Sequence, residues 1–161
     1  MNYRYIDSPL GRVLIAGDEK GLTWLAFARG RQRSTPLPEW VAASGDALLS
    51  ETQRQLDAYF AGKIARFDLP LNPRGTEFQK RVWKTLVAIP FGQTISYTEL
   101  AQRVGRPTAI RAAGAANGQN PVSVIIPCHR VLGKNGDLTG YGGGLDAKRR
   151  LLELEGCTGV E

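Results

Sequence analysis

Residues 76–117 read TEFQKRVWKTLVAIPFGQTISYTELAQRVGRPTAIRAAGAAN, and this stretch decides the fold of the second half of the chain. Its first helix begins at a capping box, in which Thr76 caps the helix and the Gln79 side chain reaches back to the cap. Apolar residues then recur at helical spacing until Pro90, which cannot continue a helix. The stretch therefore opens a mostly helical domain.

Two further short helices follow, joined by a connection that contains glycine. Ser96 repeats the capping pattern at the start of one helix, and Gly105 ends it. We expect Pro107 to be the first residue of the next helix, over 108–117. Helices joined in this way fit a helix-turn-helix, whose second helix would lie against a DNA groove. The alternative is a helical hairpin inside a core, which the spacing alone favours.

The third helix has an unusually bare outer face. Arg111 is its one long side chain, among small residues that include Ala112 and Gly114. Small residues let another backbone approach closely, but they offer few groups able to read base edges. This pattern predicts contact with DNA that is largely independent of base sequence.

Positive charge is concentrated in the same half of the chain. Residues 1–75 carry ten Lys and Arg residues against eight Asp and Glu, whereas residues 76–150 carry eleven against four. The formal net charge is +6. A basic half is expected of a surface that meets phosphates, and a generally basic, solvated surface is the alternative.

The first half predicts a small sheet domain. Segments rich in β-branched and aromatic residues predict strands over 2–7, 10–16, 21–28 and 67–71, the first three as an antiparallel meander. A helix is expected over 46–61 and an exposed loop over 29–45. The predicted class is α+β, with a small α/β domain over 1–72 that has an antiparallel sheet and a mostly helical domain over 73–161.

Composition excludes several functional classes. The chain has 161 residues, of which 42% are hydrophobic and 22% charged, as in ordinary globular proteins. No apolar run is long enough to span a bilayer, and the start lacks a secretory signal, so a cytoplasmic protein is expected. Two cysteines and one histidine form neither a disulfide framework nor a zinc site. No nucleotide-binding motif is present, and no metal or other cofactor is expected.

The candidate nucleophile is Cys128. It follows an expected buried strand over 122–126 that Pro127 ends, and His129 is its neighbour. A cysteine reacts as its thiolate and needs a base or a cation nearby, but neighbours in an extended chain point to opposite faces, so a bridging water or a sharp turn would have to connect the two. A small buried cysteine at a strand end is the alternative. Candidates for the acid that orients His129 are Asp137, Asp146, Glu153 and Glu155.

Glycines crowd residues 136–146, which read GDLTGYGGGLD. The segment is either a flexible surface loop or a pocket wall in which backbone meets a flat ligand, with Tyr141 as an aromatic face.

The run IIPCHRVLGKNGDLTGYGGGLDAKRRLLELEG at 125–156, with SYTELA and NPVS upstream, closely resembles the alkylguanine-DNA alkyltransferases, also called methylated-DNA–protein-cysteine methyltransferases. The resemblance covers about residues 73–156, and PCHRV matches the active-site signature of the family. With less specific motifs, the first half resembles the ribonuclease H-like N-terminal domain of stand-alone bacterial members.

The resemblance implies roles for the catalytic residues. Cys128 would accept the alkyl group, His129 would be its base through a water, and Glu155 would orient His129. Tyr97 would crowd the phosphate of the target and donate a proton to the leaving guanine.

The resemblance also implies a DNA-binding face and a base pocket. Arg111 would fill the gap left by the extruded base, with Ala112 and Gly114 at the DNA surface. Asn120 would stabilise the turn that carries the active-site segment. The pocket would be lined by the backbone at Cys128 and by Val131, Tyr141, Gly142 and Gly143.

The implied activity is direct repair of double-stranded DNA. The alkyl group on the position-6 oxygen of a flipped-out guanine, and also the position-4 oxygen of thymine, would pass irreversibly to Cys128 of a monomer, once per molecule. A non-enzymatic damage-binding or regulatory helix-turn-helix protein and a Cys-His hydrolase are the alternatives. Gly142 stands where some members carry serine, which predicts a larger pocket and tolerance of alkyl groups larger than methyl.

Overall fold

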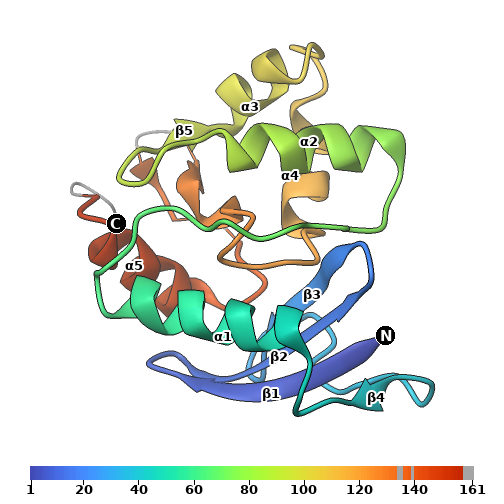
Figure 1. Ribbon diagram of the computed structural model, residues 1–161. Coiled ribbons are helices and arrows are strands. Elements are labelled where there is room, and N and C mark those ends of the chain that lie inside the picture. Colours follow the sequence, from blue (N-terminus) through green and yellow to red (C-terminus); the bar gives the residue numbers. More distant parts are fainter. Residues whose placement is uncertain (134–135, 139, 158–161) are drawn as a thin grey trace.

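The computed structural model describes residues 1–133, 136–138 and 140–157 (Figure 1). Lys134, Asn135 and Thr139 of the motif run lie outside the described residues, as do the last four positions of the expected domain 73–161.

The first half is a four-stranded sheet with one helix packed on it (Figure 1). Strands β1 (Asn2–Ser8), β2 (Gly11–Asp18) and β3 (Gly21–Phe27) form the expected antiparallel meander, and the sheet order is β3-β2-β1-β4. Strand β4 (Val41–Ala42), parallel to β1, falls within the segment expected to be a loop. Two residues are too few to produce a strand pattern in the sequence, so only the pairing reveals this strand.

Helix α1 (Ala47–Phe60) confirms the helix expected in the first half. Asp46 caps it by accepting a hydrogen bond from the amide of Leu49 at 2.9 Å. Its inner face buries Leu49, Leu56 and Tyr59. Tyr59 lies in the last turn, from which its hydroxyl reaches the second half of the molecule.

The strand expected over 67–71 is wrong. Within this segment only Leu71 forms a β-bridge, with Leu22. The Pro70 carbonyl accepts a hydrogen bond from Leu22, but Pro70 has no amide hydrogen to extend the ladder.

The second half contains the expected helical segment. Helix α2 (Glu77–Val87) begins at the complete capping box, and Ser96 caps α3 (Tyr97–Arg103). Helix α4 (Ile110–Gly118) begins later than expected, because the amide of Ala109 donates to the carbonyl of Arg106 in a turn. Pro107 therefore lies in the connection and is not the first residue of the helix.

Residues 122–126 are buried as expected but do not form a strand. Val124 has a φ of 72°, and Ile126 donates to the carbonyl of Val122, so the chain turns here, and within this segment only Val122 forms a β-bridge, with Leu25. A short 3-10 helix, Cys128–Arg130, follows, and then β6 (Val131–Leu132), which pairs with β5 (Ile95–Ser96). Helix α5 (Leu145–Leu154) completes the described chain.

The two halves are joined along the free edge of β3. The amide of Leu25 donates to the carbonyl of Pro121, and the amide of Ser123 donates to the carbonyl of Leu25. Apolar side chains of both halves form one buried cluster. The sheet domain therefore supports the turn that leads to Cys128. No helix among the described residues has the length and apolar character to cross a bilayer.

Candidate active site

Cys128 begins the 3-10 turn at the point where the buried segment ends. The Asn120 side chain ties this turn together: its Nδ2 donates to the carbonyl of Ile126 at 2.7 Å, and its Oδ1 accepts from the amide of Val122 at 3.0 Å. The amide of Cys128 donates to the same carbonyl of Ile126 at 2.8 Å. The side chain of Asn120 thus holds together the turn that carries the thiol.

The thiol of Cys128 lies in a low-dielectric environment. The residue is 5% exposed, and burial raises the pKa of its thiol to about 11. A hydrogen bond from Asn120 and the positive charge of Lys148 lower this pKa, but burial outweighs both. The resting cysteine is therefore a protonated thiol that needs a base to react.

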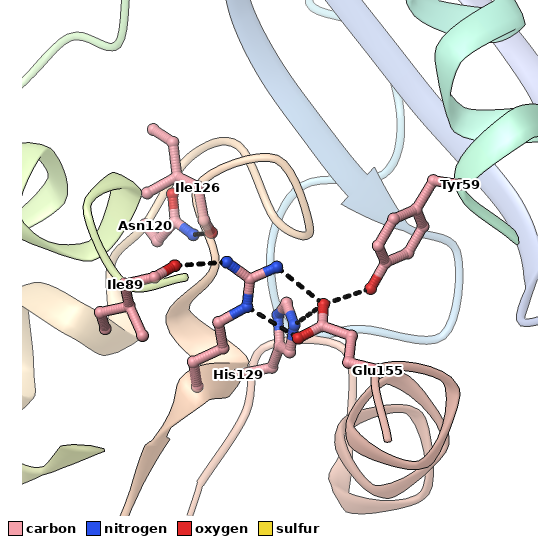
Figure 2. A network of polar contacts seen from close by, with 7 residues as sticks. Tyr59, Ile89, Asn120, Ile126, His129 and Glu155 are labelled. Carbon is pink, nitrogen blue, oxygen red and sulfur yellow. Dashed lines mark hydrogen bonds and ion pairs between the residues drawn. The ribbon is translucent and has the colours of Figure 1, made fainter. Parts of the chain in front are cut away.

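Glu155, the C-cap residue that follows α5, lies at the centre of a buried polar network (Figure 2). Its Oε2 contacts His129 Nε2 at 2.8 Å and accepts from the Tyr59 hydroxyl at 2.5 Å. Arg130 donates hydrogen bonds to both carboxylate oxygens, from Nε to Oε1 at 2.7 Å and from Nη2 to Oε2 at 2.9 Å. The remaining Arg130 nitrogen, Nη1, donates to the carbonyl of Ile89 at 2.6 Å. Residues from both halves thus meet at one carboxylate.

Hydrogen bonds to the carboxylate decide the charge state of this network. Burial raises the pKa of Glu155, but hydrogen bonds from His129 and Arg130 outweigh burial and lower it to about 2. Burial lowers the pKa of His129, although Glu155 opposes that shift. Glu155 is therefore ionised with Arg130 as its counter-charge, and His129 is neutral at neutral pH.

A neutral His129 has one donor and one acceptor nitrogen. Its Nε2 faces the ionised Glu155, so this nitrogen must carry the proton. Its Nδ1 is buried and has no hydrogen-bond partner among the described residues, which leaves a free lone pair. Within the described residues, neither ring nitrogen of His129 is hydrogen-bonded to Cys128, because Nε2 contacts Glu155 and Nδ1 has no partner.

Removing the Tyr59 hydroxyl tests the network without changing the charges of its members. We expect Tyr59→Phe to lower the free energy of unfolding by about 1.5–3 kcal/mol, because a hydrogen bond to a charged group is lost. Urea unfolding measures the change. Tyr5→Phe is a matched control, since its hydroxyl donates to the neutral backbone carbonyl of Ser34 and its loss should cost about 0.5–1.5 kcal/mol. Equal losses in the two variants would contradict a charged acceptor at Tyr59.

The residues expected at a DNA surface lie on α3 and α4. Tyr97 is the first residue of α3, and its ring lies against Gly114, where an added Cβ would be 3.5 Å from Cδ1. Arg111 and Ala112 are exposed at the start of α4. These residues therefore share one region, apart from the buried Glu155 network.

The glycine-rich segment passes beside His129. Tyr141 is 4% exposed, and its ring centroid is 6.4 Å from that of His129. Gly143 packs against Tyr141 and Phe27. The absence of a side chain at Gly142 was expected to enlarge the pocket. In the structure Gln32 occupies that space, because a Cβ on Gly142 would lie 2.6 Å from Gln32 Oε1.

Two buried polar residues that the sequence did not single out hold backbone carbonyls of the site. Lys148 Nζ donates to the carbonyl of Val131 at 2.8 Å, and Asn117 Nδ2 lies 3.5 Å from the carbonyl of Cys128. The carbonyl of Cys128 also accepts a hydrogen bond from the amide of Val131. The burial of Lys148 could have been predicted from the sequence, since helical spacing places it on the same face of α5 as Leu151 and Leu152.

The other missed residues are Tyr59, Arg130 and Gln32. Arg130 follows the Cys-His pair directly and could have been paired with an acid on that ground. Tyr59 and Gln32 bond residues of the other half of the chain, and no local pattern in the sequence indicates these contacts. Among the four candidate acids, Asp137, Asp146 and Glu153 are exposed, and Glu155 bonds His129.

Two family models match most of the chain. The family model described as "6-O-methylguanine DNA methyltransferase, ribonuclease-like domain" matches residues 1–73, and "6-O-methylguanine DNA methyltransferase, DNA binding domain" matches residues 77–157.

Individual relatives are similar over nearly their full lengths. A methylated-DNA–protein-cysteine methyltransferase of Methanosarcina acetivorans is 49% identical over 97% of this chain and 99% of its own. The crystal structure of Mycobacterium tuberculosis OGT in complex with DNA is 50% identical, covers 96% of this chain and 92% of its own, and superposes with a TM-score of 0.89. A Methanococcus jannaschii O6-methylguanine DNA methyltransferase is 28% identical over 94% of this chain and 92% of its own, with a TM-score of 0.65. The chain therefore belongs to the 6-O-methylguanine DNA methyltransferase family.

Proposed function

We propose that this protein repairs alkylated DNA by transferring the alkyl group from the position-6 oxygen of guanine to its own Cys128, once per molecule. The observation that carries the proposal is a buried thiol next to a neutral histidine that has a free Nδ1 and is oriented by an ionised Glu155. Membership of the methyltransferase family and the match to its DNA-binding domain support it.

The reaction balances with groups that the chain supplies. His129 takes the thiol proton through a water, and the sulfur of Cys128 forms a bond to the alkyl carbon. The bond between that carbon and the guanine oxygen breaks, its electron pair passes to the base, and Tyr97 donates a proton to the leaving guanine. A thiolate with a high pKa is intrinsically a strong nucleophile, which favours this displacement.

Burial of the sulfur requires the target base to leave the duplex. Flipping a nucleotide costs a few kcal/mol, and a damaged base that pairs poorly costs least, which helps selection. The thioether that forms has no good leaving group, so the protein is consumed in one turnover.

The exposed start of α4 suits contact with DNA of any sequence. In this proposal Arg111 fills the gap in the base stack, and Ala112 and Gly114 let the DNA backbone approach. Asn120 keeps the reactive turn in place, and the carbonyls of Cys128 and Val131 read the edge of the guanine against the wall formed by Tyr141, Gly142 and Gly143.

Replacing Arg111 tests the extrusion of the base. We expect Arg111→Ala to transfer about tenfold more slowly from duplex DNA, equivalent to about 1.4 kcal/mol, because the gap in the stack is left unfilled. Single-turnover rates on duplex and on single-stranded DNA measure the effect, and the single strand should show none. Arg81→Ala, which removes an exposed cation from α2, is the control for charge. Equal slowing on both substrates would contradict the role of Arg111.

Intact mass spectrometry tests the proposed function. The protein is incubated with an oligonucleotide that contains O6-methylguanine, and one methyl group should be added per molecule, at Cys128 by peptide mapping. Continued release of product without added mass would instead indicate a hydrolase, and binding without transfer would indicate a damage-binding protein. The same assay with O4-methylthymine tests the second lesion. We further propose that the protein is a monomer, that its two domains meet between residues 72 and 73, and that it needs no cofactor.

A further inference from the structure

Gln32 reaches from the sheet domain to the turn that carries Cys128. It lies in the loop between β3 and β4. Its Nε2 donates to the carbonyl of Asn120, and its Oε1 lies 3.4 Å from the hydroxyl of Ser123. Asn120 in turn bonds the carbonyl of Ile126 at 2.7 Å, two residues before the acceptor. One side-chain amide thus contacts two residues of the segment that leads to Cys128.

The same amide lies against the glycine-rich segment. A Cβ on Gly142 would be 2.6 Å from Gln32 Oε1 and 2.9 Å from its Cδ. The neighbouring amide of Arg31 donates to the carbonyl of Gly142 at 2.6 Å, and a Cβ on Gly30 would be 2.5 Å from that carbonyl. Gly142 does not have a left-handed φ. A Cβ at position 142 would therefore require the Gln32 amide to move away from Asn120 and Ser123, whereas the backbone of Gly142 itself does not call for glycine.

This contact lies close to the catalytic pair. Tyr141, the neighbour of Gly142, is 4% exposed, and its ring faces that of His129 at a centroid distance of 6.4 Å. A shift of the glycine-rich segment would therefore change the space beside His129.

We propose that Gln32 is a positioning and specificity-determining residue for alkyl transfer, which holds the glycine-rich segment against the Cys128 turn and limits the size of the group transferred. The inference rests on the proposed function. It assigns to the sheet domain a direct part in the substrate pocket, beyond its support of the fold.

Two substrates separate the two roles of Gln32. Single-turnover transfer is measured from O6-methylguanine and O6-benzylguanine in the same single-stranded oligonucleotide, which removes any effect on base flipping. Gln32→Ala should slow methyl transfer severalfold and raise the benzyl-to-methyl rate ratio about tenfold, since space opens beside Gly142. Gln32→Glu keeps the bulk but sets a carboxylate against the carbonyl of Asn120. It should slow methyl transfer without raising the ratio.

The control is Thr35→Ala, an exposed position in the same loop, which should leave both rates unchanged. A benzyl-to-methyl ratio that stays the same in Gln32→Ala would overturn the inference. If the wild-type protein transfers neither group, the proposed function fails, and this outcome is distinct from an unchanged ratio in an active protein.

A double-mutant cycle tests the contact itself. Gly142→Ala should slow methyl transfer about tenfold in the wild-type background, because its Cβ collides with the Gln32 amide. In the Gln32→Ala background the same substitution should have little effect. Melting temperatures of all four proteins show whether each is folded. Equal slowing by Gly142→Ala in both backgrounds would show that the two residues are not coupled, and the proposal would be wrong.

Discussion

Cys128→Ala is expected to abolish alkyl transfer while leaving the binding of damaged DNA intact. The substitution removes the sulfur that forms the new bond, and the second cysteine has no comparable surroundings. Cys157 is half-buried and lies beyond the end of α5, and burial raises the pKa of its thiol. It is not among the residues that bond the Glu155 network.

The measurement combines intact mass with a binding titration. Wild type, Cys128→Ala and Cys157→Ala are incubated with the same methylated duplex. Wild type and Cys157→Ala should each gain one methyl group, whereas Cys128→Ala should gain none and still shift the DNA in a gel. Addition of a methyl group to Cys128→Ala, or failure of Cys157→Ala to gain one, would contradict the assignment of Cys128 as the acceptor.

Glu155→Gln is expected to have the largest effect on stability. It leaves the Arg130 guanidinium buried without a counter-charge and removes the acceptor that fixes the tautomer of His129. Breaking a buried ion pair from one side costs about 3–5 kcal/mol, a large part of the stability of a domain. Urea unfolding measures this loss. Glu153→Gln, exposed on the same helix, should change stability by less than about 0.5 kcal/mol.

A double variant separates stability from chemistry. Replacing both partners, as in Arg130→Met with Glu155→Leu, removes the unpaired charge and should recover part of the lost stability, although the Tyr59 hydroxyl and His129 Nε2 then lack their acceptor. It should not recover transfer, because His129 then has no carboxylate to orient it. Recovery of both properties would mean that Glu155 only supports the fold.

The same network makes stability depend on pH. Native Glu155, with its pKa near 2, stays ionised where the unfolded chain takes up a proton near about pH 4.3, so stability falls as the pH falls from about 4.3 towards 2. The lowered pKa of His129 acts in the same direction below about pH 6.5, because only the unfolded state binds that proton readily. Unfolding midpoints measured across this pH range should fall less steeply for Glu155→Gln than for the wild type, because the variant has no carboxylate to protonate. An identical pH profile in the variant would be evidence against an ionised Glu155.

Elements defined by local interactions were predictable from the sequence. The antiparallel meander, α1 and the capping box of α2 follow from alternation, helical spacing and hydrogen bonds between residues three apart. The two-residue strands β4, β5 and β6 were missed, since their existence depends on partners far along the chain. The strand expected over 122–126 failed for a related reason. Its apolar run indicates burial correctly, but periodicity cannot distinguish a strand from buried turns.

The amino-acid sequence by itself determined the α+β class, the basic helical half and, through its active-site signature, the family and the candidate acceptor Cys128. Spacing in the sequence left four acids open as the partner of His129, and the tertiary structure shows that it is Glu155, with Arg130 as the counter-charge. The tertiary structure also brings Tyr59 and Gln32 to the site. The contacts Tyr59–Glu155 and Gln32–Asn120 join residues 96 and 88 positions apart. Such contacts arise when the two halves pack together, and no local pattern of residues encodes them.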